Sequence, residues 1–288
     1  MIRIALTAVA AALALAAPVF AAGKKAPPAP AAPAQPGPAD WRTPDPENIL
    51  VIDTNKGRIL VEITPATAPG HAPRIRDLTR AGIYNGRTFF RVIEGFMAQT
   101  GDPKDNGTGD TDRPNLPAEF TFRRGPESPM VVVDTQAVAD IGFVGPVPVT
   151  SQSSMLMPMT ADGKVNAWAF FCPGVAGMAR GEEPDSANAQ FFLMRDSYPK
   201  LERRYTVWGR VISGLEVVRT LKTGEPVEAP QDRMDRVRLL ADMPANERPQ
   251  IRLIDPAGPW FKAEVERNRA LNEGVVSPCG LKIPVEVK

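Results

Sequence analysis

Short apolar runs that alternate with polar residues and stop at turn residues recur along this chain. They constrain its fold more than any other feature does. The first pair is "ILVIDTNKGRILVEI" at residues 49–63, where the turn-rich residues 55–57 separate two strand-like runs. In the second run Ile59, Val61 and Ile63 alternate, as one face of a half-buried strand does. This segment is therefore predicted to form an antiparallel hairpin.

Similar patterns predict several more strands but only two helices in the central part of the chain. The strands are expected within residues 87–103, with a break near Gly95, and at "QFFLMR" (190–195), "YTVWGRVI" (205–212) and "RVRLLA" (236–241). The helices are expected at Pro73 to Ala81 and around Leu215, Val218 and Leu221. Many strands with two helices predict a mostly β fold, a closed antiparallel β-barrel capped by two helices.

The N-terminal residues are predicted to lie outside this fold. Arg3 precedes an apolar stretch from Ile4 to Ala17, and "VFA" at 19–21 fits a small-residue cleavage pattern. Residues 1–22 are therefore interpreted as a signal peptide, because the apolar stretch is short for a membrane span. Residues 23–44, rich in Pro and Ala, are expected to be a disordered linker. If the source is a Gram-negative bacterium, the exported protein is expected in the periplasm, without a membrane anchor.

The rest of the chain divides into a main domain and two additions of unassigned role. The main domain is predicted over residues 45–243, with an insertion at about 125–173 in which short strands are expected at 130–133 and 166–171. Residues 244–288 form a C-terminal extension, predicted to contain a strand at 250–254 and a helix at 260–271.

The charge of the chain disfavours some classes of partner. There are 34 Lys and Arg residues against 33 Asp and Glu, and removal of Arg3 with the signal peptide leaves 33 of each. A net charge of about zero argues against general binding to nucleic acid or to anionic membranes. We expect a monomer.

Residues that commonly carry catalysis or bind metals are scarce. His71 is the only histidine, and its position at a predicted helix start favours a structural or solvated side chain over a catalytic one. Without a second histidine, a Ser-His-Asp or Cys-His arrangement and a histidine-rich metal site are not expected. No metal site or cofactor is predicted. Cys172 and Cys279 form a disulfide in one interpretation, enclosing 279 − 172 = 107 residues, and are separate buried thiols in the other.

Arg91 is the residue that raises a chemical question. It interrupts an apolar run of Phe89, Phe90, Val92 and Ile93. Spacing alone favours a structural arginine, paired with a carboxylate such as Glu94 or Asp102. However, one reaction needs little more than a fixed cation beside an apolar pocket, namely rotation about the bond that precedes proline. Amide resonance sets its barrier at roughly 18–20 kcal/mol, and a donor directed at the prolyl nitrogen stabilises the twisted state more than the planar one.

Several separated motifs in this sequence are similar to those of the cyclophilin family of peptidyl-prolyl cis–trans isomerases. The stretch "YNGRTFFRVIEGFMAQTGDP" followed by "NGTG" resembles the family's first signature, and "PAEF" resembles the segment after it. "GMARGEEPDSANAQFFLM" resembles the second signature, and "YTVWGRVISGLEVVRTLKTGEP" resembles the closing strand and helix. The resemblance runs from about residue 48 to 226, apart from the insertion.

The resemblance implies a set of site residues. It assigns Arg91 as the catalytic arginine and Gln99 as the amide that binds the substrate backbone, with Gln190 beside it. The hydrophobic proline pocket and the peptide groove are implied at Phe96, Met97, Ala179, Phe192, Leu201 and Tyr205. Three departures stand out: Tyr205 and Lys200 differ from the family's usual residues, and "RG" at 180–181 replaces its usual Asn-Ala.

Two functions follow as predictions. The first is a peptidyl-prolyl cis–trans isomerase (EC 5.2.1.8) that acts on proline-containing polypeptides among exported or unfolded proteins. The second is a non-catalytic peptide-binding chaperone or scaffold that keeps the fold without turnover. Arg91 together with Gln99 favours the isomerase, since a module that only binds peptide does not need the arginine.

Overall fold

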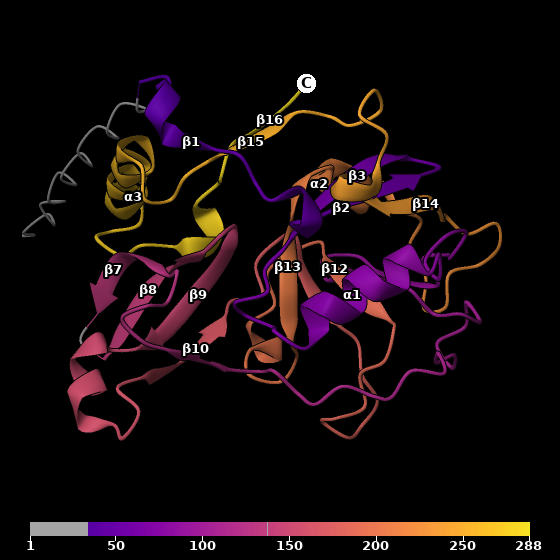
Figure 1. Cartoon of the computed structure of the whole chain (residues 1–288), viewed down its shortest axis with the longest axis horizontal. Coiled ribbons are helices and arrows are strands. Elements are labelled where there is room, and N and C mark those ends of the chain that lie inside the picture. The colour runs from indigo at the N-terminus through magenta and orange to yellow at the C-terminus, as the bar shows by residue number, and fades with distance from the viewer. Residues whose placement is uncertain (1–33, 137) are drawn as a thin grey trace, which may run out of the picture.

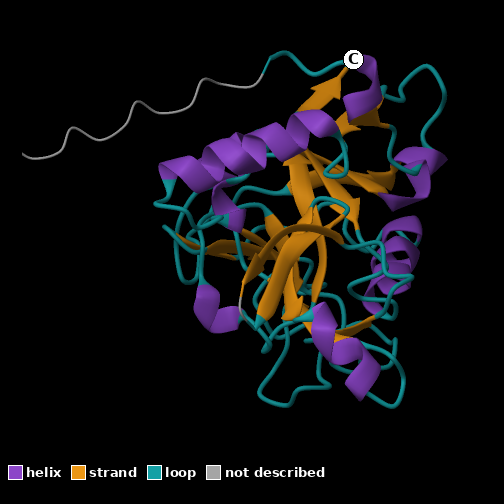
Figure 2. Ribbon diagram, turned by 90° about the vertical axis from the view of Figure 1, so that its left-hand side faces the viewer, coloured by secondary structure: helices purple, strands orange, loops and turns teal. Residues whose placement is uncertain are grey.

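The computed structural model describes residues 34–136 and 138–288, which form three antiparallel sheets with helices at the periphery (Figures 1 and 2). The mostly β character predicted from the sequence is confirmed. The predicted signal peptide and residues 23–33 of the predicted linker lie outside the described residues. No helix in the described ranges is both long and apolar enough to span a bilayer.

The main sheet has eight strands in the order β14-β2-β3-β13-β11-β12-β5-β4. The predicted hairpin forms its second and third strands, and Thr54 pairs with Gly57 next to the turn. The eight strands of this sheet are β2 Ile49–Thr54, β3 Gly57–Ile63, β4 Arg91–Ile93, β5 Met97–Thr100, β11 Val175–Met178, β12 Phe191–Met194, β13 Val207–Ser213 and β14 Met234–Leu239.

The prediction of a closed barrel is wrong, because this sheet is an open half-barrel. The edge strands β14 and β4 share no ladder, and isolated bridges such as Thr88–Arg233 and Val92–Gly224 connect the regions beside them. The segment that crosses between these edges contains Pro226 and Pro230. Proline lacks the N–H that a ladder requires, so this segment cannot complete the circle with regular pairing.

Two helices cover the main sheet, as predicted, and bury apolar side chains against it. Helix α1 spans His71–Arg80, with Ile75 and Leu78 at most 1% exposed. Helix α2 spans Leu215–Thr220 and buries Val218. The core between helices and sheet includes Trp208, Phe191, Phe89 and Tyr84, and Trp208 meets Phe191 edge to face at 5.5 Å between ring centres.

The insertion, together with residues 122–124 just before it, folds into a separate five-stranded sheet, which exceeds the two short strands expected from the sequence. Its order is β6-β10-β9-β8-β7. The strands are β6 Phe122–Arg124, β7 Val131–Gln136, β8 Ala139–Val144, β9 Val147–Gln152 and β10 Val165–Ala169. Inside it, Arg124 and the fully buried Asp140 form an ion pair at 2.7 Å.

Segments from both ends of the described chain meet beside the insertion (Figure 1). Strands β1 Trp41–Arg42, β15 Ile251–Ile254 and β16 Val285–Val287 make the third sheet, and α3 Pro259–Leu271 lies next to it. The bounds of β15 and α3 agree within one residue with the strand and helix predicted for the C-terminal extension. Phe143 of the insertion packs edge to face on Phe261 of α3 at 5.2 Å. Cys172 and Cys279 are joined by a disulfide, with Cα atoms 5.0 Å apart.

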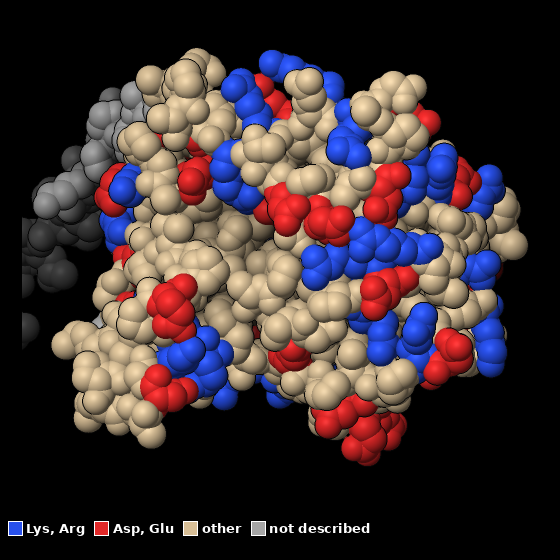
Figure 3. Space-filling view, in the orientation of Figure 1, with Lys and Arg blue, Asp and Glu red and all other residues tan. Residues whose placement is uncertain are grey.

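Six short 3-10 helices complete the secondary structure of the described ranges. They are η1 Pro38–Asp40, η2 Pro46–Asn48, η3 Ser154–Met159, η4 Pro199–Leu201, η5 Leu240–Asp242 and η6 Pro278–Gly280. Basic and acidic side chains lie interspersed on the face shown in Figure 3, as a nearly neutral chain leads one to expect.

Candidate active site

Nearly all of the residues that the family resemblance assigns to the site line one cavity of about 170 Å³. Gln190, which is absent from its wall, lines an adjoining cavity of about 300 Å³ that also includes Gln99 and Ala179. The first cavity is lined by Arg91, Phe96, Met97, Gln99, Ala179, Arg180, Phe192, Leu201 and Tyr205. The fold thus brings together side chains from segments more than a hundred residues apart.

Strand pairing explains why these side chains meet. Arg91 of β4 lies opposite Gln99 of β5, and Gln99 lies opposite Phe192 of β12. Directly paired residues project from the same face of a sheet, so the three form one row across it. Phe192 pairs in turn with Gly177 of β11, where an added Cβ would meet the Phe192 ring at 2.4 Å. The glycine therefore gives the ring room to lie on the sheet.

The apolar wall is made of buried or half-buried rings and aliphatic chains. Met97 and Phe192 are 2% and 5% exposed, and Leu201 is 9% exposed. Tyr205 meets Phe192 edge to face at 5.8 Å, so it walls the pocket despite its departure from the family pattern. Behind Phe192, the ring of Phe171 from the insertion stacks at 6.1 Å. The insertion therefore supports the floor of the pocket.

A line of polar contacts runs along the other side of the cavity. Arg91 Nε donates to Glu225 Oε1 at 2.6 Å, and Nη1 donates to Gln99 Oε1 at 3.3 Å. Gln99 Nε2 donates to Gln190 Oε1 at 3.0 Å, and Gln190 Nε2 donates to the carbonyl of Gly109 at 3.0 Å. The contacts fix the plane of the guanidinium. A guanidinium has five N–H donors, so donors remain for a substrate.

Glu225 is the site residue that sequence reasoning missed. It lies 134 residues after Arg91, in the loop that follows α2, and no motif assigned it a role. The carboxylates that spacing offered as partners lie elsewhere: Glu94 pairs with Arg195, and Asp102 accepts backbone N–H groups.

No cluster of three or more His, Cys, Asp or Glu side chains with the geometry to hold a metal ion occurs within residues 34–136 and 138–288. His71 is fully buried, and its Nδ1 contacts Glu119 Oε2 at 2.6 Å, outside the cavity wall.

A family model described as cyclophilin type peptidyl-prolyl cis-trans isomerase matches residues 49–241. The chain belongs to the cyclophilin family. This cyclophilin is 35% identical over 195 residues to a probable peptidyl-prolyl cis-trans isomerase of Brucella abortus, an alignment that covers 64% of the chain and 76% of the relative. It is 28% identical over 176 residues to peptidyl-prolyl cis-trans isomerase B of Bacillus subtilis, covering 61% of the chain and 90% of that relative.

A solved structure extends the likeness beyond the family region. Cyclophilin AquaCyp293 from Hirschia baltica superposes with a TM-score of 0.78 at 33% identity, covering 87% of this chain and 94% of that one. The coverage exceeds the family region, so the similarity takes in part of the additions. The predicted family and the enzyme class, peptidyl-prolyl cis–trans isomerase, are confirmed.

Asp102 organises the loop that carries Gly107 and Gly109 in this cyclophilin. Its buried carboxylate accepts N–H groups from Lys104 at 2.8 Å, Asn106 at 2.9 Å and Gly107. Burial by itself raises the pKa of Asp102, but the backbone donors outweigh it and lower the pKa below its ordinary value of 3.8. A Cβ at Gly109 would meet Asp102 Oδ1 at 1.9 Å, so the loop closes only around glycine.

This arrangement predicts a pH-dependent loss of stability. Because the folded-state pKa is lowered, the stabilisation is complete above the unfolded-state pKa and disappears as the pH falls through the folded-state pKa. We expect the free energy of unfolding to fall as the pH is lowered below about 5, and Asp102→Asn to lower it at neutral pH by about 1–3 kcal/mol with a shallower dependence on pH. Urea unfolding across this range measures both, with the exposed Asp112→Asn as control. Parallel pH curves for Asp102→Asn and the wild type would contradict the assignment.

Proposed function

We propose that this cyclophilin accelerates rotation about X–Pro bonds, with Arg91 stabilising the twisted prolyl amide above the hydrophobic pocket. The observation that carries the proposal is the position of Arg91, which borders an apolar cavity together with Phe96, Met97 and Phe192. Rotation removes the amide resonance and leaves a lone pair on the prolyl nitrogen. A donor that meets this lone pair only in the twisted state lowers the barrier, and arginine remains a donor at any ordinary pH.

The remaining groups have supporting roles in the proposed mechanism. The apolar wall holds the proline ring, so that the rotating bond is presented to the guanidinium in a fixed orientation. Gln99 is placed to bind the substrate backbone, because it adjoins both cavities and contacts Arg91. The predicted substrates are proline-containing segments of exported or unfolded proteins.

The periplasm remains the proposed location. The support is the pattern of residues 1–22 together with the disulfide, because disulfides persist in oxidising compartments and are rare in the cytosol. Export of a fusion of residues 1–22 to a reporter active only outside the cytoplasm would test it; a cytoplasmic fusion would contradict it.

A protease-coupled assay on a short Ala-Pro peptide tests the activity. Wild-type protein is expected to accelerate the slow cis-to-trans phase in proportion to its concentration. A rate equal to background, in protein that still binds the peptide, would favour the non-catalytic peptide-binding function.

Glu225 is expected to act as a positioning residue for Arg91. Its carboxylate lies 2.6 Å from Arg91 Nε and 2.5 Å from Nη2, so it fixes the direction of the guanidinium. We predict that Glu225→Ala lowers kcat about tenfold, less than the roughly 100-fold cost of a misplaced catalytic group because Gln99 still contacts Arg91, with little change in KM.

The test of this role compares three variants. Glu225→Gln retains one acceptor, so it is expected to recover part of the lost kcat. Glu228→Ala removes an exposed carboxylate from the same loop and is expected to behave as wild type. If Glu225→Ala changed only KM, or lost no activity, the positioning role would be wrong.

A further inference from the structure

Two arginines border the proposed proline pocket, and their charges are compensated differently. Arg91 is paired with Glu225. Arg180 makes no ion pair with any carboxylate of residues 34–136 or 138–288; its Nε donates to the carbonyl of Arg204 at 3.0 Å, and its Nη1 donates to the carbonyls of Gly181 at 2.8 Å and Glu182 at 3.0 Å. Arg180 therefore keeps an uncompensated positive charge at the wall of the site.

Aromatic rings hold this guanidinium in place without neutralising it. The guanidinium carbon lies 4.6 Å from the ring centre of Tyr205 and 5.4 Å from that of Phe120. Together with the three carbonyls, these rings fix a half-buried side chain that would otherwise be mobile. A preorganised cation loses little conformational entropy when an anion binds to it.

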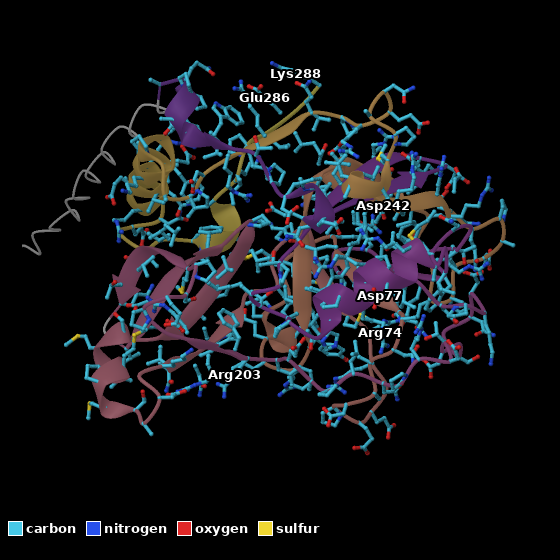
Figure 4. All side chains as sticks on the ribbon, viewed as in Figure 1. Arg74, Asp77, Arg203, Asp242, Glu286 and Lys288 are labelled. Carbon is cyan, nitrogen blue, oxygen red and sulfur yellow. A yellow bond between two sulfur atoms is a disulfide. The ribbon has the colours of Figure 1, made fainter. Side chains whose placement is uncertain are left out.

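Charges around the site balance farther out but not at the cavity wall. Arg203, which Figure 4 labels and whose guanidinium lies 5.2 Å from the ring centre of Trp168, belongs to the loop that follows η4. Counted together with Arg180, the basic and acidic residues of both neighbouring loops offset each other: Arg180, Lys200, Arg203 and Arg204 against Glu182, Glu183, Asp185 and Glu202. No carboxylate lines the 170 Å³ cavity, while the exposed Asp110 lines the adjoining one. At contact distance, Arg180 is therefore the unbalanced charge.

The position of Gln99 indicates which substrate residue meets Arg180. The amide that Arg91 can reach lies on the N-terminal side of the proline ring. Gln99 contacts Arg91 and lines both cavities, so a peptide whose proline ring filled the first cavity would continue past Gln99 toward the adjoining one. Arg180 lines both cavities as well. The residue immediately before proline must therefore pass this guanidinium.

We propose that this cyclophilin prefers substrates in which an acidic residue immediately precedes proline, with Arg180 as the specificity-determining residue. The inference rests on the proposed isomerase function. The pair would be partly exposed to water and screened by salt, which limits the preference to about twofold to fivefold.

The experiment compares three peptides that differ only in the residue before proline: Glu, its neutral isostere Gln, and Lys. For wild-type protein at low ionic strength, kcat/KM is expected to be about twofold to fivefold higher for Glu-Pro than for Gln-Pro, and lowest for Lys-Pro. The differences should shrink when salt is raised to about 0.5 M, because screening weakens the attraction.

Variants of Arg180 assign the effect to this side chain. Arg180→Gln is expected to make the Glu-Pro and Gln-Pro rates equal, whereas Arg180→Lys is expected to keep most of the preference. The control, Lys262→Gln on the exposed face of α3, is expected to show the wild-type preference. Equal rates for Glu-Pro and Gln-Pro in the wild type, or a preference that survives in Arg180→Gln, would overturn the proposal. If no peptide were turned over, the proposed function would fail; dissociation constants of the same peptides from NMR titration would then decide the preference in the same way.

Discussion

Replacing Arg91 with alanine is expected to lower kcat/KM for a short X–Pro peptide by about 100-fold to 1,000-fold, the range seen when a preorganised donor to a transition state is removed. The loss should fall mainly on kcat, because the proposed hydrogen bond forms only as the amide twists. Arg91 is half-buried at the cavity wall and its partner Glu225 is already exposed, so its removal leaves no buried charge unpaired and keeps the core intact. A protease-coupled assay measures the activity, and circular dichroism with urea unfolding checks the fold.

Two further variants separate donation from charge. Arg91→Lys keeps a positive charge but loses the planar fork, so it is expected to recover little of the activity. Arg87→Ala, which removes a neighbouring arginine that pairs with Asp105 outside the pocket, serves as the matched control. An Arg91→Ala protein with near wild-type kcat would contradict the proposed mechanism while leaving the fold assignment untouched.

Removing the disulfide is expected to lower the free energy of unfolding more than Asp102→Asn does. The cross-link closes a loop of 107 residues between Cys172 and Cys279. The chain-entropy relation values such a loop at about 5 kcal/mol of unfolding free energy. Cys279→Ala is the informative variant because Cys279 is only partly buried, whereas Cys172 is fully buried and its replacement would also leave a cavity.

Reduction provides an independent check of the cross-link. Wild-type protein in a reducing agent should unfold at nearly the same urea concentration as Cys279→Ala, and the variant itself should not respond to the agent. A wild-type midpoint that is unaffected by reduction, with two free thiols titrated in oxidised protein, would show that the cysteines do not pair.

The elements that could be predicted are those whose own sequence carries a strong period. Strands β2 and β3 alternate around a turn, and the buried face of α1 repeats at helical spacing, so both were found within about two residues. The strands β1 and β16 have two and three residues, too few for a pattern to emerge. The extent of the insertion sheet is harder to predict because Gly142 and Pro148 interrupt the apolar pattern of β8 and β9, although these two strands pair without a register shift.

The site residues likewise divide into those that sequence motifs can predict and one that they cannot. The family resemblance is sufficient to predict the site residues that stand within contiguous motifs: Phe96, Met97, Gln99 and Phe192. Strand pairing then places these residues together. Glu225 could not be foreseen, since its approach to Arg91 depends on how the proline-containing loop crosses the open side of the half-barrel. The same crossing is the reason that the barrel does not close.

The shared core around Phe261 has a consequence for truncation. That core joins Trp41, Phe143 and Leu281, which come from the beginning, middle and end of the described chain. A protein shortened at residue 243 would keep every side chain of the active site, yet it would leave Trp41 without its pairing strand and Phe143 facing water. A shortened enzyme would therefore tend to aggregate or be digested by proteases before any defect in turnover became visible.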